Sequence, residues 1–226
     1  GDHILMEKAI EFTRSEHPHL FVIAGNVATG HAYKRLALAG AHAIRTSVGS
    51  GSICTTRIQT GHGIPTFQAI LDCYDARKEH LDNGKDWPTP YIIADGGIKN
   101  SGDIVKSLAA GADFVMLGSM LSGTKETPGE IIEQDGKKFK QYNGMASKTA
   151  QKDWKGTYNS VEGVSSFVQY KGTISKVINE IMSNVRSGMS YSGANTLQEL
   201  IDNAVFRKQT SSSHVEGNPH IFNRKK

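Results

Sequence analysis

Four short apolar runs, separated by amphipathic stretches, set the pattern of this chain. The runs are nearly continuous rather than alternating, as expected for strands buried on both faces: FVIAGNV (21–27), AHAIRTSVG (41–49), PYIIADGG (90–97) and DFVMLGS (113–119). Helical periodicity fills the intervals between them, at 29–40, 67–81 and 102–110. Strands that alternate with helices in this way predict parallel βα units.

Two of these units are similar to each other. One unit reads VIAGNVATGHAYKRLALAGAHA and the other IIADGGIKNSGDIVKSLAAGADF, and they align with a gap of one residue. Both run from a strand through a glycine turn and a helix into Ala-Gly-Ala. Repeated βα units occur in (β/α)8 barrels and in doubly wound sheets. No strand is followed by G-x-G-x-x-G, which disfavours a Rossmann fold.

The second half of the chain has a different amino-acid composition. Residues 131–172 are polar and rich in Gly, Lys and Ser, with short strand candidates at 137–144 and 165–172. A stretch of that length in a compact domain is either a functional flap or a disordered insertion. The next segment predicts a helix that begins after Thr173 and packs one apolar face in the core: Ile174, Val177, Ile178, Ile181, Met182 and Val185.

Composition narrows the classes of function. The chain has 226 residues, of which 38% are hydrophobic and 21% charged, as in one globular domain. No apolar run could span a bilayer and the first residues lack a signal-peptide pattern, so we expect a cytoplasmic protein without membrane contact. The net charge of +4 is diffuse, without a basic stripe interleaved with aromatics, which argues against nucleic acid and suits substrates that carry phosphate.

Three glycine-rich segments follow predicted strands: SVGSGS, ADGGI and MLGS. Glycine lets backbone N–H groups approach a ligand, and a helix N-terminus beyond the loop favours an anion. In (β/α)8 barrels the loops after the last two strands often bind phosphate, and ADGGI and MLGS end consecutive strands; two tight turns without a ligand are the alternative. Asp95, between a buried strand and two glycines, needs hydrogen-bond donors, and ribose hydroxyls would supply them.

Cys54 follows the first glycine-rich segment, in SVGSGSICTTR (47–57). A thiolate in a loop of free N–H groups can attack an electron-poor carbon, whereas a structural thiol is the alternative. Thr55 and Thr56 could move protons or cap a turn, and Glu162 could act as a base or lie solvated on the surface. Cys73, within a helical run, is expected to be structural, and the nine histidines show no metal-ligand spacing.

Together these segments resemble the family of IMP dehydrogenases and GMP reductases. The resemblance covers nearly the whole chain, through IAGNV, VGSGSICTTR, TGHG, IIADGGI, GADFVMLGSML, ETPGE, DGKKFKQYNGMAS, VEG, YKG and MSYSGA. It implies a (β/α)8 TIM barrel that binds a purine nucleoside monophosphate and a nicotinamide dinucleotide. It also implies a homotetramer and a monovalent cation, potassium.

The resemblance also implies roles for individual residues. Cys54 would attack C2 of the purine to form a covalent thioimidate, while Thr56 and Glu162 handle protons. The phosphate of the substrate would be held by Ser52, Gly97, Gly118 and Ser119, and its ribose by Asp95. The other substrate contacts would come from Gly96, Tyr142, Gly144, Met145, Ala146 and Gly163. The cofactor would contact Met145, Tyr158 and Asn159. The cation would lie at the backbone carbonyls of Gly49, Gly51 and Cys54.

The flap separates the two activities of the family. Dehydrogenases resemble one another in an Arg-Tyr pair on a longer flap that activates water, whereas KTAQKDWKGTYNSVEG is short and contains no arginine. CTTRIQTGHG also looks like the reductases. The resemblance therefore favours a GMP reductase, which converts GMP to IMP and ammonia with NADPH. An IMP dehydrogenase, which oxidises IMP to XMP with NAD, and a non-catalytic nucleotide-binding half-barrel remain as alternatives.

The four predicted strands are half of a barrel. The resemblance assigns them to strands 5–8, so residues 1–226 would form the C-terminal part of a single catalytic domain with a flap at about 131–172. A four-stranded half leaves an open sheet edge and an exposed apolar face. The other strands would come from residues upstream of this sequence, from another chain, or from a second half.

Overall fold

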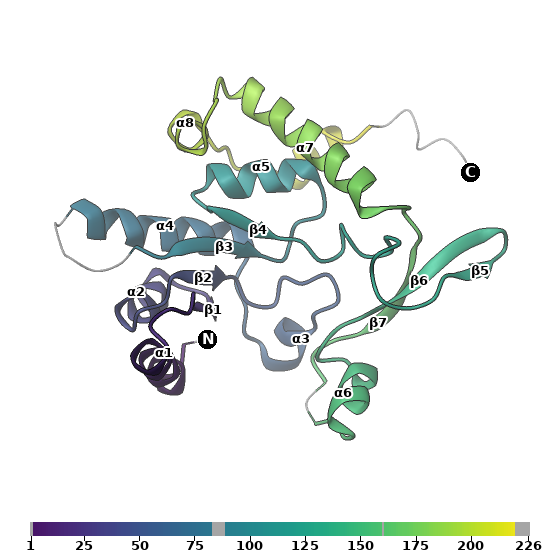
Figure 1. Ribbon diagram of the computed structural model, residues 1–226. Helices are drawn as coiled ribbons and strands as arrows, with labels where there is room; N and C mark the ends of the chain where they lie inside the picture. Colours follow the sequence, from purple (N-terminus) through teal and green to yellow (C-terminus); the bar gives the residue numbers. More distant parts are fainter. Residues whose placement is uncertain (1, 83–88, 160, 220–226) are drawn as a thin grey trace.

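The computed structural model describes residues 2–82, 89–159 and 161–219. A four-stranded parallel sheet forms the body, and a three-stranded antiparallel sheet lies to one side of it (Figure 1). The parallel sheet has the order β1 (Ile23–Val27), β2 (Ala43–Thr46), β3 (Tyr91–Asp95) and β4 (Phe114–Met116). The α/β prediction with parallel strands is therefore confirmed.

Helices cover one face of the parallel sheet. α1 (Ile4–Glu16) precedes β1, and α2 (Gly30–Leu38), α4 (Thr66–Asp82) and α5 (Ser101–Ala109) connect successive strands close to their predicted bounds. Alternate residues of a strand point to opposite faces. The helix-covered face and the helices on it share one core that includes Ala24, Ile44, Ile92, Ala94, Tyr33, Leu36, Ile70 and Cys73. Cys73 is fully buried, as expected of a structural thiol, and burial raises the pKa of its thiol to about 12.

The opposite face of the parallel sheet is left uncovered by the described residues. Ile23, Tyr91 and Phe114 are each about half exposed, at 54%, 49% and 54%, and Met116 is exposed beside them. The Tyr91 and Phe114 rings meet edge to face, with their centroids 5.5 Å apart. The sequence predicts an exposed apolar face for half of a barrel, and the half-barrel itself stays a prediction.

A second core joins α5 to α7 (Ile174–Tyr191) and α8 (Leu197–Asn203). The prediction for α7 was partly wrong, because Ile181 and Val185 are buried but Ile178 and Met182 are exposed. Thr173 occupies the N-cap position without capping through its side chain. The carboxylate of Glu126 accepts the Ile174 N–H instead, at 2.8 Å. A further short helix, α9 (Ser211–Glu216), follows α8.

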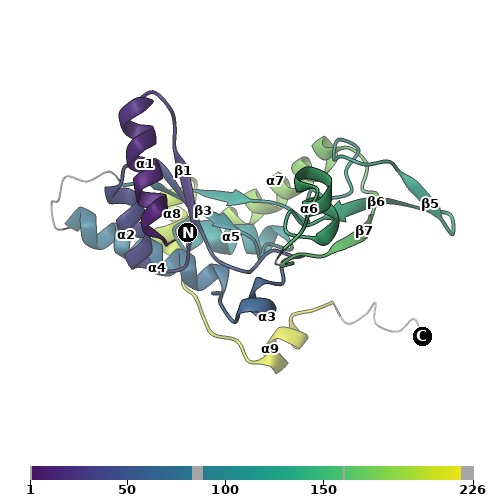
Figure 2. The ribbon, with the colours of Figure 1, turned by 90° about the horizontal axis from the view of Figure 1, so that it is seen from below.

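The flap consists of β5 (Ile132–Gln134), β6 (Lys137–Asn143) and β7 (Ser165–Gln169), paired antiparallel in that order, with α6 (Lys148–Lys155) between β6 and β7. The two strand candidates are confirmed as β6 and β7, whereas β5 and α6 were not predicted. Figure 2 shows the flap extending away from the body, at the end toward which the parallel strands run. Within the described ranges, no helix is long and apolar enough to cross a membrane.

Candidate active site

The loops after β2, β3 and β4 meet the flap around a cavity of about 580 Å³. Parallel strands end at the same edge of their sheet, so the three glycine-rich loops converge there. Every residue predicted to be catalytic or to contact the substrate lines this cavity: Ser52, Cys54, Thr56, Asp95, Gly96, Gly97, Gly118, Ser119, Tyr142, Gly144, Met145, Ala146, Glu162 and Gly163. The cavity has the size of known small-ligand sites.

A chain of hydrogen bonds runs from Cys54 to the flap. The Cys54 thiol donates to Thr56 Oγ1 at 3.2 Å, and the Thr56 hydroxyl donates to Glu162 Oε2 at 2.6 Å. All three side chains are half-buried. Thr56 is the first residue of α3 (Thr56–Thr60), and its hydroxyl connects a thiol to a carboxylate rather than capping the helix. The chain offers a path for a proton between Sγ and the carboxylate.

Backbone hydrogen bonds hold the flap to the Cys54 loop. The Thr55 N–H donates to the Glu162 carbonyl at 2.8 Å, and the Val164 N–H donates to the Ile53 carbonyl at 3.0 Å. Between them, Cys54 and Gly163 form an isolated antiparallel bridge. A short ladder therefore holds Glu162 beside the Cys54 loop.

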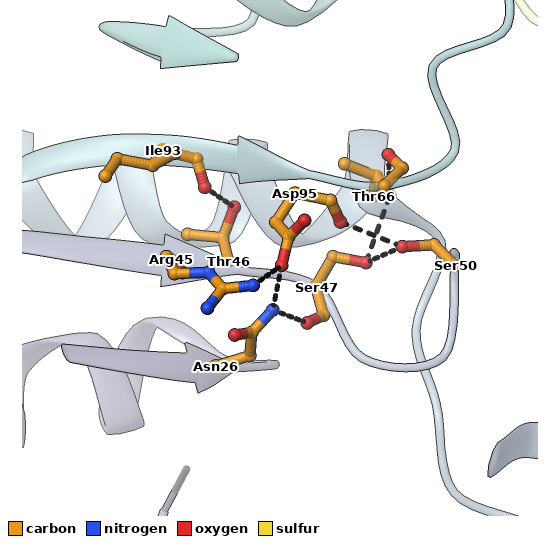
Figure 3. A network of polar contacts seen from close by, with 9 residues as sticks. Asn26, Arg45, Thr46, Ser47, Ser50, Thr66, Ile93 and Asp95 are labelled. Atoms are coloured by element: carbon orange, nitrogen blue, oxygen red, sulfur yellow. Dashed lines mark hydrogen bonds and ion pairs between the residues drawn. The ribbon is translucent and has the colours of Figure 1, made fainter. Parts of the chain in front are cut away.

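The Asp95 carboxylate, at the end of β3, is held by Arg45 of β2 and Asn26 of β1 (Figure 3). Asp95 Oδ2 accepts from Arg45 Nη2 at 2.6 Å and from Asn26 Nδ2 at 2.8 Å. The protein itself supplies donors to this carboxylate, so Asp95 does not depend on ribose hydroxyls for partners, and the expected ribose contact stays a prediction. Arg45 Nε is buried and has no hydrogen-bond partner among the described residues. Arg45 and Asn26 were not predicted as site residues. Their polar side chains within otherwise apolar strands could have indicated them.

Hydroxyl groups tie the loop after β2 to the end of β3 (Figure 3). The Ser47 and Ser50 hydroxyls lie 2.6 Å apart, and the Thr66 hydroxyl reaches Ser47 Oγ at 3.0 Å. The Ser50 hydroxyl donates to the Asp95 carbonyl at 3.0 Å. Ser50 lines the cavity, and Ser47 and Thr66 support the lining from behind; none of the three was among the predicted site residues.

The glycine-rich loops differ in the N–H groups that they offer to an anion. The Gly97 N–H donates to the Ser50 carbonyl at 2.9 Å, so it is already engaged, which departs from its expected role at a phosphate. The N–H groups of Gly118 and Ser119 have no acceptor among the described residues. A Cβ atom on Gly118 would lie 3.0 Å from Tyr142 Oη, and that hydroxyl lies 3.5 Å from Ser52 Oγ. The loop after β4 is thus the better anion site.

Three predicted residues lie outside the cavity lining: Gly49, Tyr158 and Asn159. Tyr158 lies against α6, where the Lys148 and Lys152 ammonium groups are 4.7 and 5.6 Å from its ring centroid. The Asn159 N–H donates to a side-chain oxygen of Gln151 on the same helix, at 3.3 Å. Two of the three residues predicted to contact the cofactor, Tyr158 and Asn159, therefore pack on α6, whereas Met145 lines the cavity.

The carbonyls of the Cys54 loop are unequal as cation ligands. The Gly51 carbonyl accepts the Cys54 N–H at 3.1 Å, whereas those of Gly49 and Cys54 accept no hydrogen bond from the described residues. Within the same residues, no cluster of three or more His, Cys, Asp and Glu side chains could hold a metal ion. Any cation here would depend on backbone oxygens, which suits a hard monovalent ion better than a transition metal.

The chain is similar to known proteins over nearly its whole length. A family model described as the IMP dehydrogenase / GMP reductase domain matches residues 1–220. Inosine-5′-monophosphate dehydrogenase of Nitrosopumilus maritimus is 41% identical over 229 residues, covering 95% of this chain and 46% of the relative. The enzyme of the same name from Streptococcus pyogenes is 43% identical over 218 residues, covering 92% and 43%.

A solved structure resembles the fold closely. It is a Cys-to-Ala variant of GMP reductase from Trypanosoma brucei in complex with guanosine 5′-monophosphate, with a TM-score of 0.89 and 35% identity over 97% of this chain and 45% of that one. The chain thus spans somewhat less than half the length of these relatives. The family match and the shared fold lead to one conclusion: the chain belongs to the IMP dehydrogenase / GMP reductase family.

Proposed function

We propose that the protein is a GMP reductase, which converts GMP to IMP and ammonia at the expense of NADPH. The observation that carries the proposal is the hydrogen-bond chain from Cys54 through Thr56 to Glu162 in a cavity of nucleotide size. A thiol, a hydroxyl and a carboxylate in series are the groups needed to expel an amine from a purine carbon.

The reaction follows from that chain. The Cys54 proton passes through Thr56 toward Glu162, and the thiolate attacks C2 of GMP. The departing amine takes a proton back along the same path, so it leaves as ammonia, and Sγ and C2 form a thioimidate. NADPH, when bound, supplies a hydride to C2. The C2–S bond then breaks, its electron pair returns to Cys54, and IMP is released.

The loops around the cavity would hold the nucleotide. The free N–H groups of Gly118 and Ser119, with the Tyr142 and Ser52 hydroxyls beside them, suit a 5′-phosphate. Asp95, held by Arg45, would accept from the ribose through its other carboxylate oxygen. The other residues that the sequence predicts at the substrate also line the cavity and would contact the nucleotide: Gly96, Gly97, Gly144, Met145, Ala146 and Gly163.

The site also has groups that fit a cofactor and a cation. The Arg45 Nε–H is buried without a partner in the described part of the chain and would donate to a ligand oxygen. The Met145 side chain is 74% exposed at the cavity. We assign NADPH to Met145 and, where α6 ends, to Tyr158 and Asn159. The carbonyls of Gly49, Gly51 and Cys54 would ligate potassium, two of them being free to do so.

We further infer that the chain is the C-terminal half of a (β/α)8 barrel. The uncovered apolar face of the parallel sheet supports this, because in a closed barrel that face lies inside. β1 to β4 would be strands five to eight of one catalytic domain, residues 1–226, with a flap at about 131–172. Barrels of this family would assemble as a homotetramer.

A second candidate is IMP dehydrogenase, which oxidises IMP to XMP with NAD. Relatives of that name are 41–43% identical to the chain. The resemblance implies that a dehydrogenase activates water with a positively charged arginine beside a tyrosine of the flap. In this chain Lys148 and Lys152 place ammonium groups at the Tyr158 ring instead of an arginine. The reductase needs no such group.

Nicotinamide absorbance, followed over time, tests the proposal. With NADPH and GMP, absorbance should fall for the wild type and stay constant for Cys54→Ala. Reduction of NAD with IMP, and no loss of NADPH with GMP, would identify a dehydrogenase instead. Reversible GMP binding with no turnover and equal affinity in Cys54→Ala would mean a non-catalytic nucleotide-binding half-barrel.

A further inference from the structure

A lysine ammonium group is buried where the flap meets the body. Lys140 lies on β6 and is only 2% exposed. Its Nζ donates to the Thr124 and Lys125 carbonyls, each at 3.2 Å, and to the Thr127 carbonyl. Three N–H donors thus meet three backbone acceptors of one turn, which offsets the cost of removing the charge from water.

A second lysine of the flap binds the same loop nearer the cavity. Lys171, just beyond β7, donates through Nζ to the Ser119 carbonyl at 2.7 Å and to the Met120 carbonyl at 3.2 Å. Its own N–H donates to the Gly123 carbonyl at 2.9 Å. Desolvation lowers the pKa of this lysine, as expected for an ammonium partly enclosed by the protein. The ammonium groups of Lys140, on β6, and Lys171, just after β7, therefore hold residues 119–127.

This loop and the flap carry different parts of the site. The loop offers the free N–H groups of Gly118 and Ser119. The flap carries Tyr142, two residues after Lys140 on β6, and Glu162, which closes the hydrogen-bond chain from Cys54. A ligand that orders the loop would therefore order the flap through the lysine contacts, provided that those contacts are rigid.

We propose that Lys140 is a positioning residue that couples binding of the nucleotide phosphate to the placement of the flap, with Lys171 as its exposed partner. The inference rests on the proposed function, since it takes Gly118 and Ser119 as the phosphate donors. Binding energy from the phosphate, remote from C2, would in this way hold Glu162 on the nucleophile's loop. A phosphate-free nucleoside would not gain this ordering.

Hydrogen exchange of flap peptides tests the coupling without any turnover. Wild type, Lys140→Met and Lys138→Met are compared with no ligand, with GMP, and with inorganic phosphate alone. Lys138 is the matched control, because it is an exposed lysine on the same strand whose ammonium makes no hydrogen bond or ion pair with the described residues. GMP and phosphate should slow exchange in residues 137–143 and 161–169 of the wild type and of Lys138→Met.

In Lys140→Met this protection should disappear, and the Kd for GMP should rise about tenfold, the ratio that one lost charged contact readily produces. Equal protection and equal Kd in Lys140→Met and wild type would overturn the proposal, as would a wild-type flap that responds to neither ligand. If Lys140→Met does not fold, Lys171→Gln replaces it, and wild-type behaviour of that variant would overturn the coupling. A protected wild-type flap without NADPH consumption would refute the reductase and leave the coupling standing.

Discussion

Replacing Thr56 by valine gives the sharpest test of the proposed chemistry. Valine keeps the shape of the side chain but removes the hydroxyl that joins Cys54 Sγ, at 3.2 Å, to Glu162 Oε2, at 2.6 Å. A hydrogen bond to a charged group contributes about 1.5–3 kcal/mol, and each 1.36 kcal/mol is a factor of ten in rate. We therefore expect kcat to fall about 10- to 150-fold, with KM for GMP little changed.

The control is Thr55→Val, on the adjacent residue. Thr55 is half-buried like Thr56, but its side chain makes no hydrogen bond to the helix that it precedes. Steady-state rates of NADPH consumption at saturating GMP should be near wild type for Thr55→Val and low for Thr56→Val. Equal rates for the two variants would mean that the hydroxyl carries no proton, and the mechanism would be wrong at that step.

Three other variants or reactions test separate parts of the structure. Burial raises the pKa of Cys73 from 9.0 to about 12, so iodoacetamide at about pH 8 should modify Cys54 and spare Cys73, which peptide mass spectrometry would show. The raised pKa of Cys73 also favours the folded state below about pH 9. This contribution to stability is lost as the pH rises toward 12. Tyr33→Phe removes a buried hydroxyl that donates to the Pro90 carbonyl at 2.6 Å, so urea unfolding should show a loss of about 1–3 kcal/mol, and unchanged stability would contradict this. Gly118→Ala places a Cβ 3.0 Å from Tyr142 Oη, so KM for GMP should rise while Tm stays near wild type; the reverse pattern would remove Gly118 from the phosphate site.

The parallel sheet could be predicted from the sequence because its strands leave a strong local signal. Residues such as Ile44 and Ile92 are buried against helices on one face, and the apolar run continues through the residues of the other face. α6 left no such signal. Its only buried residue is Gln151, and it begins where the Ser147 hydroxyl accepts the Ala150 N–H, a polar cap on a polar helix.

The candidate site was predictable in its loops but not in its supports. Glycine-rich strand ends indicated which loops meet, and the structure brings Cys54 and Thr56, from one loop, together with Glu162 from the distant flap. The partners of Asp95 depend on the register of three strands, which no local pattern encodes. The carbonyl contacts of Lys140 likewise depend on how the flap folds back, so its sequence resembles that of any exposed strand.

The hydroxyl contacts among Ser47, Ser50 and Thr66 have a consequence for enzymology. Serine and threonine side chains do not change charge over the range in which enzymes are assayed, and their partners here are other hydroxyls and backbone carbonyls. The backing of the cavity therefore keeps one shape from mildly acidic to mildly alkaline buffer. A bell-shaped dependence of rate on pH would then report on the reacting groups themselves, not on the collapse of the loop that carries them.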